Sequence, residues 1–172
     1  MGGPPRKPRA TRPPEDRPLW RCPRCGKRFV TRNVYHSCAR VPLDHHFRGR
    51  PLAKAIFRRL DALLRSFGPV RIVSNKTRVG WRVRVRFARV DPLKDGGWLD
   101  VWLPRPLLHP RVAKVREVAP RCYLHSIRLR GPEEVDAEVR GILGGAYAVG
   151  CQAHLRDRSG GPGSVAAPQT AG

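Results

Sequence analysis

The apolar positions between residues 51 and 67 recur at helical spacing and predict an amphipathic helix. They are Leu52, Ile56, Leu60, Leu63 and Phe67. Charged residues take the other side of this segment. Proline at position 51 suits a first helical turn, and the pair Gly68-Pro69 ends the helix. A helix with one apolar stripe is expected to pack against a larger element.

The segment from residue 70 to residue 130 alternates apolar and polar residues and predicts strands. The expected strands span 70–74, 78–90, 98–103, 111–118 and 121–130. A second helix is predicted to open at 131–134, where proline is followed by two acidic residues that suit a helix N-terminus.

This order predicts an α+β fold: a helix, about five mainly antiparallel strands and a helix, preceded by a small zinc-ribbon-like module. Both helices are expected to cover one face of the sheet. The other face would then be open to solvent or to a partner.

Composition divides the chain into four expected parts. Residues 1–18 are rich in proline and arginine and predict a disordered basic tail. A cysteine-bearing module is expected at 19–47 and the α+β domain at 48–150. Residues 151–172 are rich in Gly, Ser, Pro and Ala and predict a flexible tail.

The module carries four residues with the spacing of metal ligands. They are Cys22, Cys25, His36 and Cys38. A thiol pair separated by two residues can hold one tetrahedral ion from a tight knuckle, and a second pair two residues apart on a strand would face the same way. We therefore expect a structural Zn²⁺ site, with His45 and His46 as rival fourth ligands.

The local expectation for this module is a knuckle at 22–26, a strand at 27–30, a turn at 31–33 and a strand at 34–38. Trp20 and Phe29 would form its small core. A unit of this size has too little core to fold alone, so bound metal would supply much of its folding free energy.

The formal net charge of +22 points first to nucleic acid as a partner. Most of the 35 basic residues are arginine, which is also the composition that a GC-rich genome imposes on all its proteins. No apolar run approaches the length of a transmembrane helix, and no secretory signal opens the chain. These features predict a cytoplasmic protein without membrane association.

Four arginines share one phase of the strand expected at 78–90. They are Arg78, Arg82, Arg84 and Arg86. Because successive side chains of a strand alternate, all four should project from one face, where guanidinium groups can bind phosphates. The alternative is an ordinary solvated sheet face. No aromatic or helical motif for sequence-specific reading accompanies the row.

An enzymatic or small-ligand alternative would use a pocket around Lys76, Arg111 and His125. Asp91, Asp100 and Glu117 are spaced loosely like nuclease carboxylates, but the lysine expected two residues after the last acid is missing. No phosphate-binding glycine loop or nucleophile elbow occurs. The sequence therefore favours a non-enzymatic, zinc-stabilised protein that binds nucleic acid without strong sequence specificity, and a protein-interaction adaptor is a third alternative.

Several short motifs are similar to those of a bacterial family catalogued as domain of unknown function 5655. They are Cys22-Pro-x-Cys25-Gly, Arg32-Asn33, His36-Ser37-Cys38, His46-Phe47-x-Gly49, Lys76-Thr77, His109-Pro110-Arg111, Pro132-Glu-Glu-Val-Asp136 and Ala146-Tyr147-x-x-Gly150. The chain departs from the family pattern at Val34 and at Gly80-Trp81. The resemblance favours His36 over His46 as the fourth ligand and implies no activity.

Overall fold

The computed structural model describes residues 18–39, 41–153 and 155. Residues 1–17 of the basic tail predicted at 1–18 and most of the flexible tail predicted at 151–172 lie outside the described residues. Among the residues described, no helix is both long enough and apolar enough to cross a membrane.

Six antiparallel strands form the central sheet, in the order β3-β4-β5-β6-β8-β7. Their bounds are β3 Arg71–Ser74, β4 Val79–Arg82, β5 Arg86–Leu93, β6 Gly96–Leu103, β7 Val112–Ala119 and β8 Cys122–Leu129. Strands that follow one another in the chain mostly pair as hairpins, as short connections favour. The predicted α+β class is confirmed.

The single strand predicted at 78–90 is wrong, because the chain reverses between Arg82 and Arg86 to form β4 and β5. The backbone N–H groups of Arg84 and Val85 both donate to the carbonyl oxygen of Gly150, at 3.0 and 3.2 Å. The turn is thus held by a residue far away in the chain. Its own residues alternate like a continuous strand, so local pattern could not reveal it.

Helix α1 spans Pro51–Phe67, as the apolar spacing predicts. Helix α2 spans Ala137–Gly150 and begins later than predicted, because residues 132–134 form a 3-10 turn instead. The α-helix starts where the side chain of Asp136 accepts a hydrogen bond from the Val139 N–H at 3.0 Å, which satisfies one of the free donors at a helix N-terminus.

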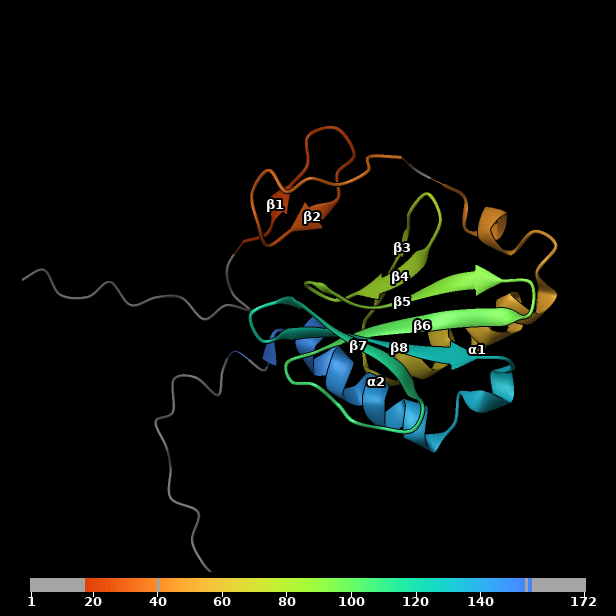
Figure 1. The fold of residues 1–172 in the computed structure, drawn as a ribbon. Helices are drawn as coiled ribbons and strands as arrows, with labels where there is room; N and C mark the ends of the chain where they lie inside the picture. The colour runs from red at the N-terminus through yellow and green to blue at the C-terminus, as the bar shows by residue number, and fades with distance from the viewer. Residues whose placement is uncertain (1–17, 40, 154, 156–172) are drawn as a thin grey trace, which may run out of the picture.

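Both helices cover the same face of the sheet, as expected (Figure 1). Trp81 of β4 is fully buried and stacks on Phe57 of α1, with 5.3 Å between ring centroids. Its indole N–H donates to Asp61 of the same helix at 2.9 Å, so this large side chain is buried without an unpaired donor. We call the opposite side of the sheet the open face.

Residues 18–39 of the cysteine-bearing module contain one small hairpin, β1 Trp20–Arg21 paired with β2 Arg28–Phe29, and the module ends in a 3-10 helix, Leu43–Phe47, that packs on α1 through Phe47. The strand predicted at 34–38 is wrong, because that segment is irregular. Lys27 Nζ donates to the carbonyl oxygens of Ser37 and Ala39, at 2.9 and 3.4 Å, in place of a strand ladder. In Figure 1 the cysteine-bearing part of the module, residues 18–39, lies beside β3, β4 and β5, apart from the two helices.

Gly150 ends α2 in close contact with β5, and this contact yields a stability prediction. A Cβ at Gly150 would lie 2.4 Å from Phe87 Cδ1, whereas a Cβ at Gly141 of the same helix would meet nothing within 4 Å. Gly150→Ala should therefore destabilise the fold by about 1–3 kcal/mol, measured by chemical denaturation. Gly141→Ala should be neutral or stabilising by up to about 1 kcal/mol. Equal effects of the two substitutions would contradict this account.

Candidate metal centre and cationic groove

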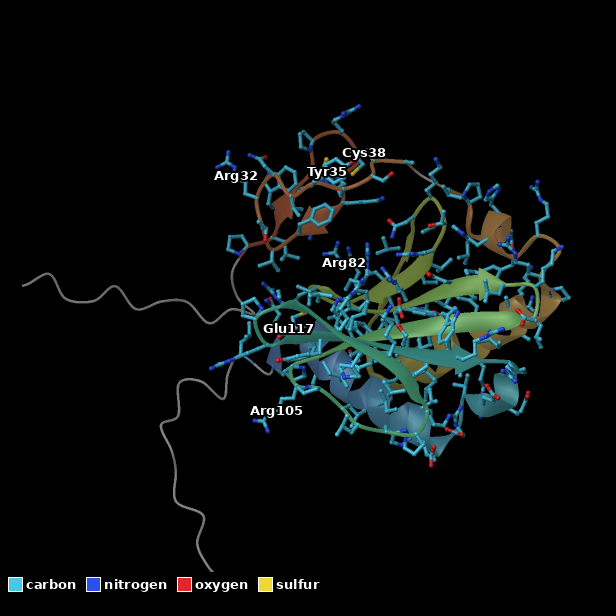
Figure 2. The ribbon with its side chains drawn as sticks, in the orientation of Figure 1. Arg32, Tyr35, Cys38, Arg82, Arg105 and Glu117 are labelled. Atoms are coloured by element: carbon cyan, nitrogen blue, oxygen red, sulfur yellow. The ribbon has the colours of Figure 1, made fainter. Side chains whose placement is uncertain are left out.

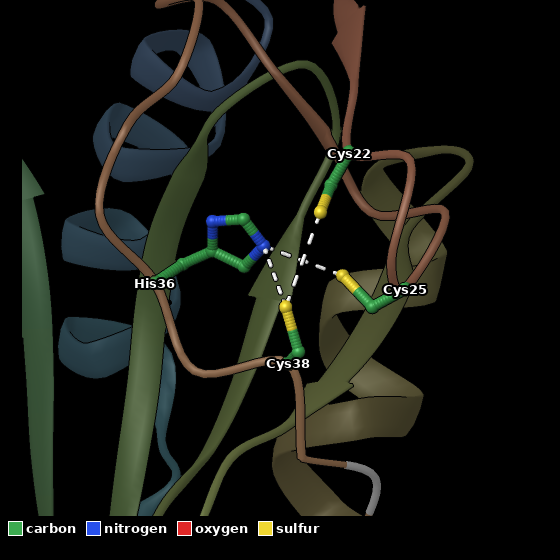
Figure 3. A group of neighbouring side chains, drawn as sticks. All are labelled: Cys22, Cys25, His36 and Cys38. Atoms are coloured by element: carbon green, nitrogen blue, oxygen red, sulfur yellow. Dashed lines mark hydrogen bonds between the residues drawn. The ribbon is translucent and has the colours of Figure 1, made fainter.

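The four predicted metal ligands converge (Figure 3). Cys22 and Cys25 come from the knuckle after β1, and His36 and Cys38 from the irregular segment. Their ligand atoms all lie within 4.8 Å of one another. Cys25 Sγ and Cys38 Sγ lie 3.3 and 3.5 Å from His36 Nε2. Such mutual distances suit donors arranged around one small cation.

His36 is held in the orientation that a metal ligand needs. Its Nδ1 lies 2.8 Å from the carbonyl oxygen of Val34, which can only accept a hydrogen bond. Nδ1 therefore carries a proton, and in the neutral ring the lone pair of Nε2 faces the sulfur atoms. This backbone contact fixes the tautomer without any further side chain.

The electrostatics of the cluster favour a bound cation. Burial opposes ionisation of Cys22, but hydrogen bonds from the backbone of Cys25 and Arg24 lower its pKa to about 6. Burial, followed by the neighbouring thiols Cys25 and Cys22, raises the pKa of Cys38. Three thiolates at this spacing repel one another unless a positive ion lies between them. The four side chains can therefore hold a metal ion.

The rival ligands His45 and His46 are not part of this cluster among the described residues. His46 is buried, and its Nε2 forms a 2.8 Å hydrogen bond with Ser74 Oγ at the end of β3. Burial, then the charges of His45 and Arg50, lowers the pKa of His46. His46 is thus a neutral packing residue of the α+β domain.

Three arginines form a row across the strands, whereas the sequence predicted a row along one strand. Arg71 of β3 lies opposite Arg82 of β4, and Arg82 lies opposite Arg86 of β5. Within the described part of the chain, none of the three has a carboxylate within 4.0 Å. Like charges on directly opposed strand residues are unfavourable, so the row carries uncompensated positive charge.

Arg82 lies at the centre of this charge. Figure 2 shows its side chain between the module and the sheet, and its guanidinium lies 6.0 Å from the ring centroid of Phe29. Burial, then the charges of Arg71, Arg86 and Arg28, lowers its pKa. Its Nε is buried without a hydrogen-bond partner in the described residues.

The row lines two adjoining cavities between the module and the sheet, with volumes of about 660 and 290 Å³. Lys27 and Arg28 of the module and Arg82 and Arg84 of the sheet line both cavities. We call these two cavities together the cationic groove. Its walls come from both parts of the chain, so it exists only when the module is folded against the sheet.

The four arginines of the row predicted from the sequence have different positions and partners in the structure. Arg82 and Arg86 belong to the cross-strand row described above. Arg78 forms an ion pair with Asp91 at 3.0 Å, and Arg84 donates from Nε to Gln152 at 3.0 Å. Sequence reasoning did not identify Arg71 and Arg28 as residues of the groove. Treating residues 71–82 as a hairpin would have placed Arg71 opposite Arg82.

Lys76, Arg111 and His125, around which the sequence predicts a pocket, do not line the cationic groove. His125 is fully buried, accepts at Nε2 from the Leu107 N–H at 2.9 Å, and lies 3.2 Å through Nδ1 from a backbone carbonyl oxygen. Arg111 contacts Asp136 at the start of α2, and Lys76 lies in the β3–β4 turn. Two of these three residues therefore serve the packing of the fold.

Comparison with known proteins places the chain in a family without assigning an activity. None of the curated proteins matches it, and neither does any solved structure. One family model, described as a domain of unknown function (DUF5655), matches residues 43–150. The match begins after the metal cluster and ends with helix α2. Because it covers more than half of the chain, this protein belongs to the DUF5655 family.

Proposed function

We propose that Cys22, Cys25, His36 and Cys38 hold a structural Zn²⁺ ion and that the module depends on it for folding. Three sulfur ligands and one imidazole are typical of closed structural zinc sites. The module has only two strands of two residues each, and its aromatic core is Trp20, Phe29 and the ring of His36. So small a core leaves the metal as the main source of folding free energy.

Zinc removal is expected to unfold the module alone. The purified protein should contain one equivalent of zinc, and a chelator should release it while the α+β domain keeps its cooperative unfolding transition, because α1, α2 and the sheet have a separate core. Metal analysis and amide hydrogen exchange measure the two effects. A metal content far below one equivalent in a preparation without chelators would contradict the proposal.

His36→Ala is expected to abolish tight zinc binding, whereas His46→Ala should retain it. His36 directs Nε2 at the sulfur atoms, whereas His46 hydrogen-bonds with Ser74. The measurement is zinc stoichiometry after dialysis. His46→Ala also serves as the matched control, since it removes an imidazole from the same chain. Retention in the first variant with loss in the second would reverse the assignment.

We further propose that the protein binds nucleic acid through charge and without strong sequence specificity, with phosphates in the cationic groove. The observation that supports this most is the cross-strand row of Arg71, Arg82 and Arg86, which lacks compensating carboxylates among the described residues. Guanidinium groups bind phosphate oxygens through two parallel hydrogen bonds. A polyanion would relieve their mutual repulsion.

Weak sequence specificity follows from the chemistry of the groove walls. They present mainly guanidinium, ammonium and aliphatic groups, which contact phosphates and sugars rather than base edges. Cysteines used as metal ligands are typical of reducing compartments, so we also propose a cytoplasmic location.

Binding to nucleic acid is expected to weaken with salt, and the arginine row should account for part of that dependence. Replacing Arg71, Arg82 and Arg86 with Gln should weaken binding to all sequences alike. The slope of log K against log salt should become less steep by about two to three units on duplex, if each arginine releases counterions from one phosphate. Fluorescence anisotropy at several salt concentrations measures both quantities.

A control variant keeps the same change in net charge. Arg58 and Arg59 are exposed on α1, on the side away from the groove, and Arg105 is exposed in the loop after β6. Replacing these three with Gln should leave the salt slope nearly unchanged. If both triple variants reduce affinity equally, binding depends only on total charge and the groove has no special role.

A further inference from the structure

A further cavity, separate from the cationic groove, lies on the open face of the sheet. Its volume is about 240 Å³, and it extends over strands β5, β6, β8 and β7. It shares no lining residue with the cationic groove. Seven of its nine lining residues are charged or polar. A cavity so rich in polar groups suits a small hydrophilic ligand rather than an apolar one.

One of its two carboxylates is fully occupied by the protein. Asp100 is buried and accepts from Arg89, with contacts of 2.6 and 2.8 Å to Oδ2, and from Ser126 Oγ at 2.5 Å to Oδ1. Both of its oxygens therefore have partners, and Arg89 is neutralised by the same contact. Arg89 and Asp100 both line the cavity. Because they are paired with each other, neither lacks a partner that a ligand would have to supply.

The other carboxylate has an unmet hydrogen bond. Asp91 Oδ2 pairs with Arg78 Nε at 3.0 Å, but Oδ1 is buried and has no partner in the described residues. Burial raises the pKa of Asp91, against the opposing charges of Arg78 and Arg89. An acceptor buried without a partner is costly, but Oδ1 has almost no accessible surface, so a ligand hydroxyl would satisfy it only after the carboxylate turns toward the cavity.

Two positively charged side chains that line the cavity lack a negatively charged partner among the described residues. Lys114 and Arg116 lie on the edge strand β7, are exposed, and have no ion pair among the described residues. Together with Arg78 and Arg89 they bring four positive charges to a cavity that has two carboxylates. The net charge of the lining is therefore +2, which matches a phosphomonoester with its charge of about −1.5 to −2 at neutral pH.

We infer that this cavity binds a hydroxylated phosphomonoester of the sugar phosphate class. The phosphate would lie against Lys114 and Arg116, and a sugar hydroxyl would donate to the Asp91 carboxylate after a rotation that exposes Oδ1. A simple carboxylate would leave about one positive charge unbalanced, and an uncharged sugar would leave both cations unpaired. Trp98, whose ring already lies 5.8 Å from the Arg128 guanidinium, would form one wall against the sugar ring.

The test is isothermal titration of the full chain with ribose 5-phosphate, inorganic phosphate and ribose. Ribose 5-phosphate should bind most tightly and ribose should not bind. The variant Lys114→Gln/Arg116→Gln should weaken ribose 5-phosphate binding at least tenfold, because both residues are exposed and their loss should not disturb folding. The matched control is Arg58→Gln/Arg59→Gln on α1, which removes the same charge and should bind as the parent does.

The variant Asp91→Asn tests the contribution of the sugar hydroxyl separately from that of the phosphate. It should weaken ribose 5-phosphate more than inorganic phosphate, and an unchanged thermal transition would show that loss of the Arg78 pair did not unfold the sheet. Absence of ribose 5-phosphate binding at millimolar concentration would overturn the inference, as would full affinity in the Lys114/Arg116 variant. Stronger binding of a 5′-phosphorylated oligonucleotide than of ribose 5-phosphate, lost in the same variant, would overturn the assignment to a small molecule.

Discussion

The contact between the end of helix α2 and the turn from β4 to β5 determines how the arginine-rich segment 78–90 folds. The Gly150 carbonyl accepts two backbone N–H groups of that turn, and the missing side chain of Gly150 allows Phe87 to approach. Without this contact, residues 78–90 have the pattern of one long strand. With it they become a hairpin, which places Arg82 on β4 and Arg86 and Arg89 on β5.

That reversal creates the charge arrangement on the open face. Arg82 and Arg86 are brought opposite each other, and the β3–β4 hairpin adds Arg71 to the same row. The row has no neighbouring carboxylates among the described residues, whereas Arg78 and Arg89 on the same face are paired with Asp91 and Asp100. Within the described part of the chain, the open face therefore divides into a region beside the module where no arginine of the row is paired and a region over β5, β6, β8 and β7 where Arg78 and Arg89 are paired but Lys114 and Arg116 are not.

The module completes the region of unpaired arginines. It has little core of its own, and its irregular segment is positioned by Lys27 and by the convergence of three thiols on His36. Through Arg28 and Phe29 it closes the cationic groove over Arg82. A metal ion held by this cluster would be coupled to the shape of the groove, because loss of the module's fold would remove one wall.

The sequence by itself determined the features that depend on local chemistry. Helix α1, the α+β class and the four converging ligands follow from apolar spacing and from short ligand spacings. Tertiary structure decided the reversal at residues 83–85, the row of Arg71, Arg82 and Arg86, and the burial of His125 within the core. The reversal and the burial of His125 depend on partners distant in the chain, Gly150 and the Leu107 N–H, about which local pattern holds no information, whereas the pairing of Arg71 with Arg82 follows from the local β3–β4 hairpin.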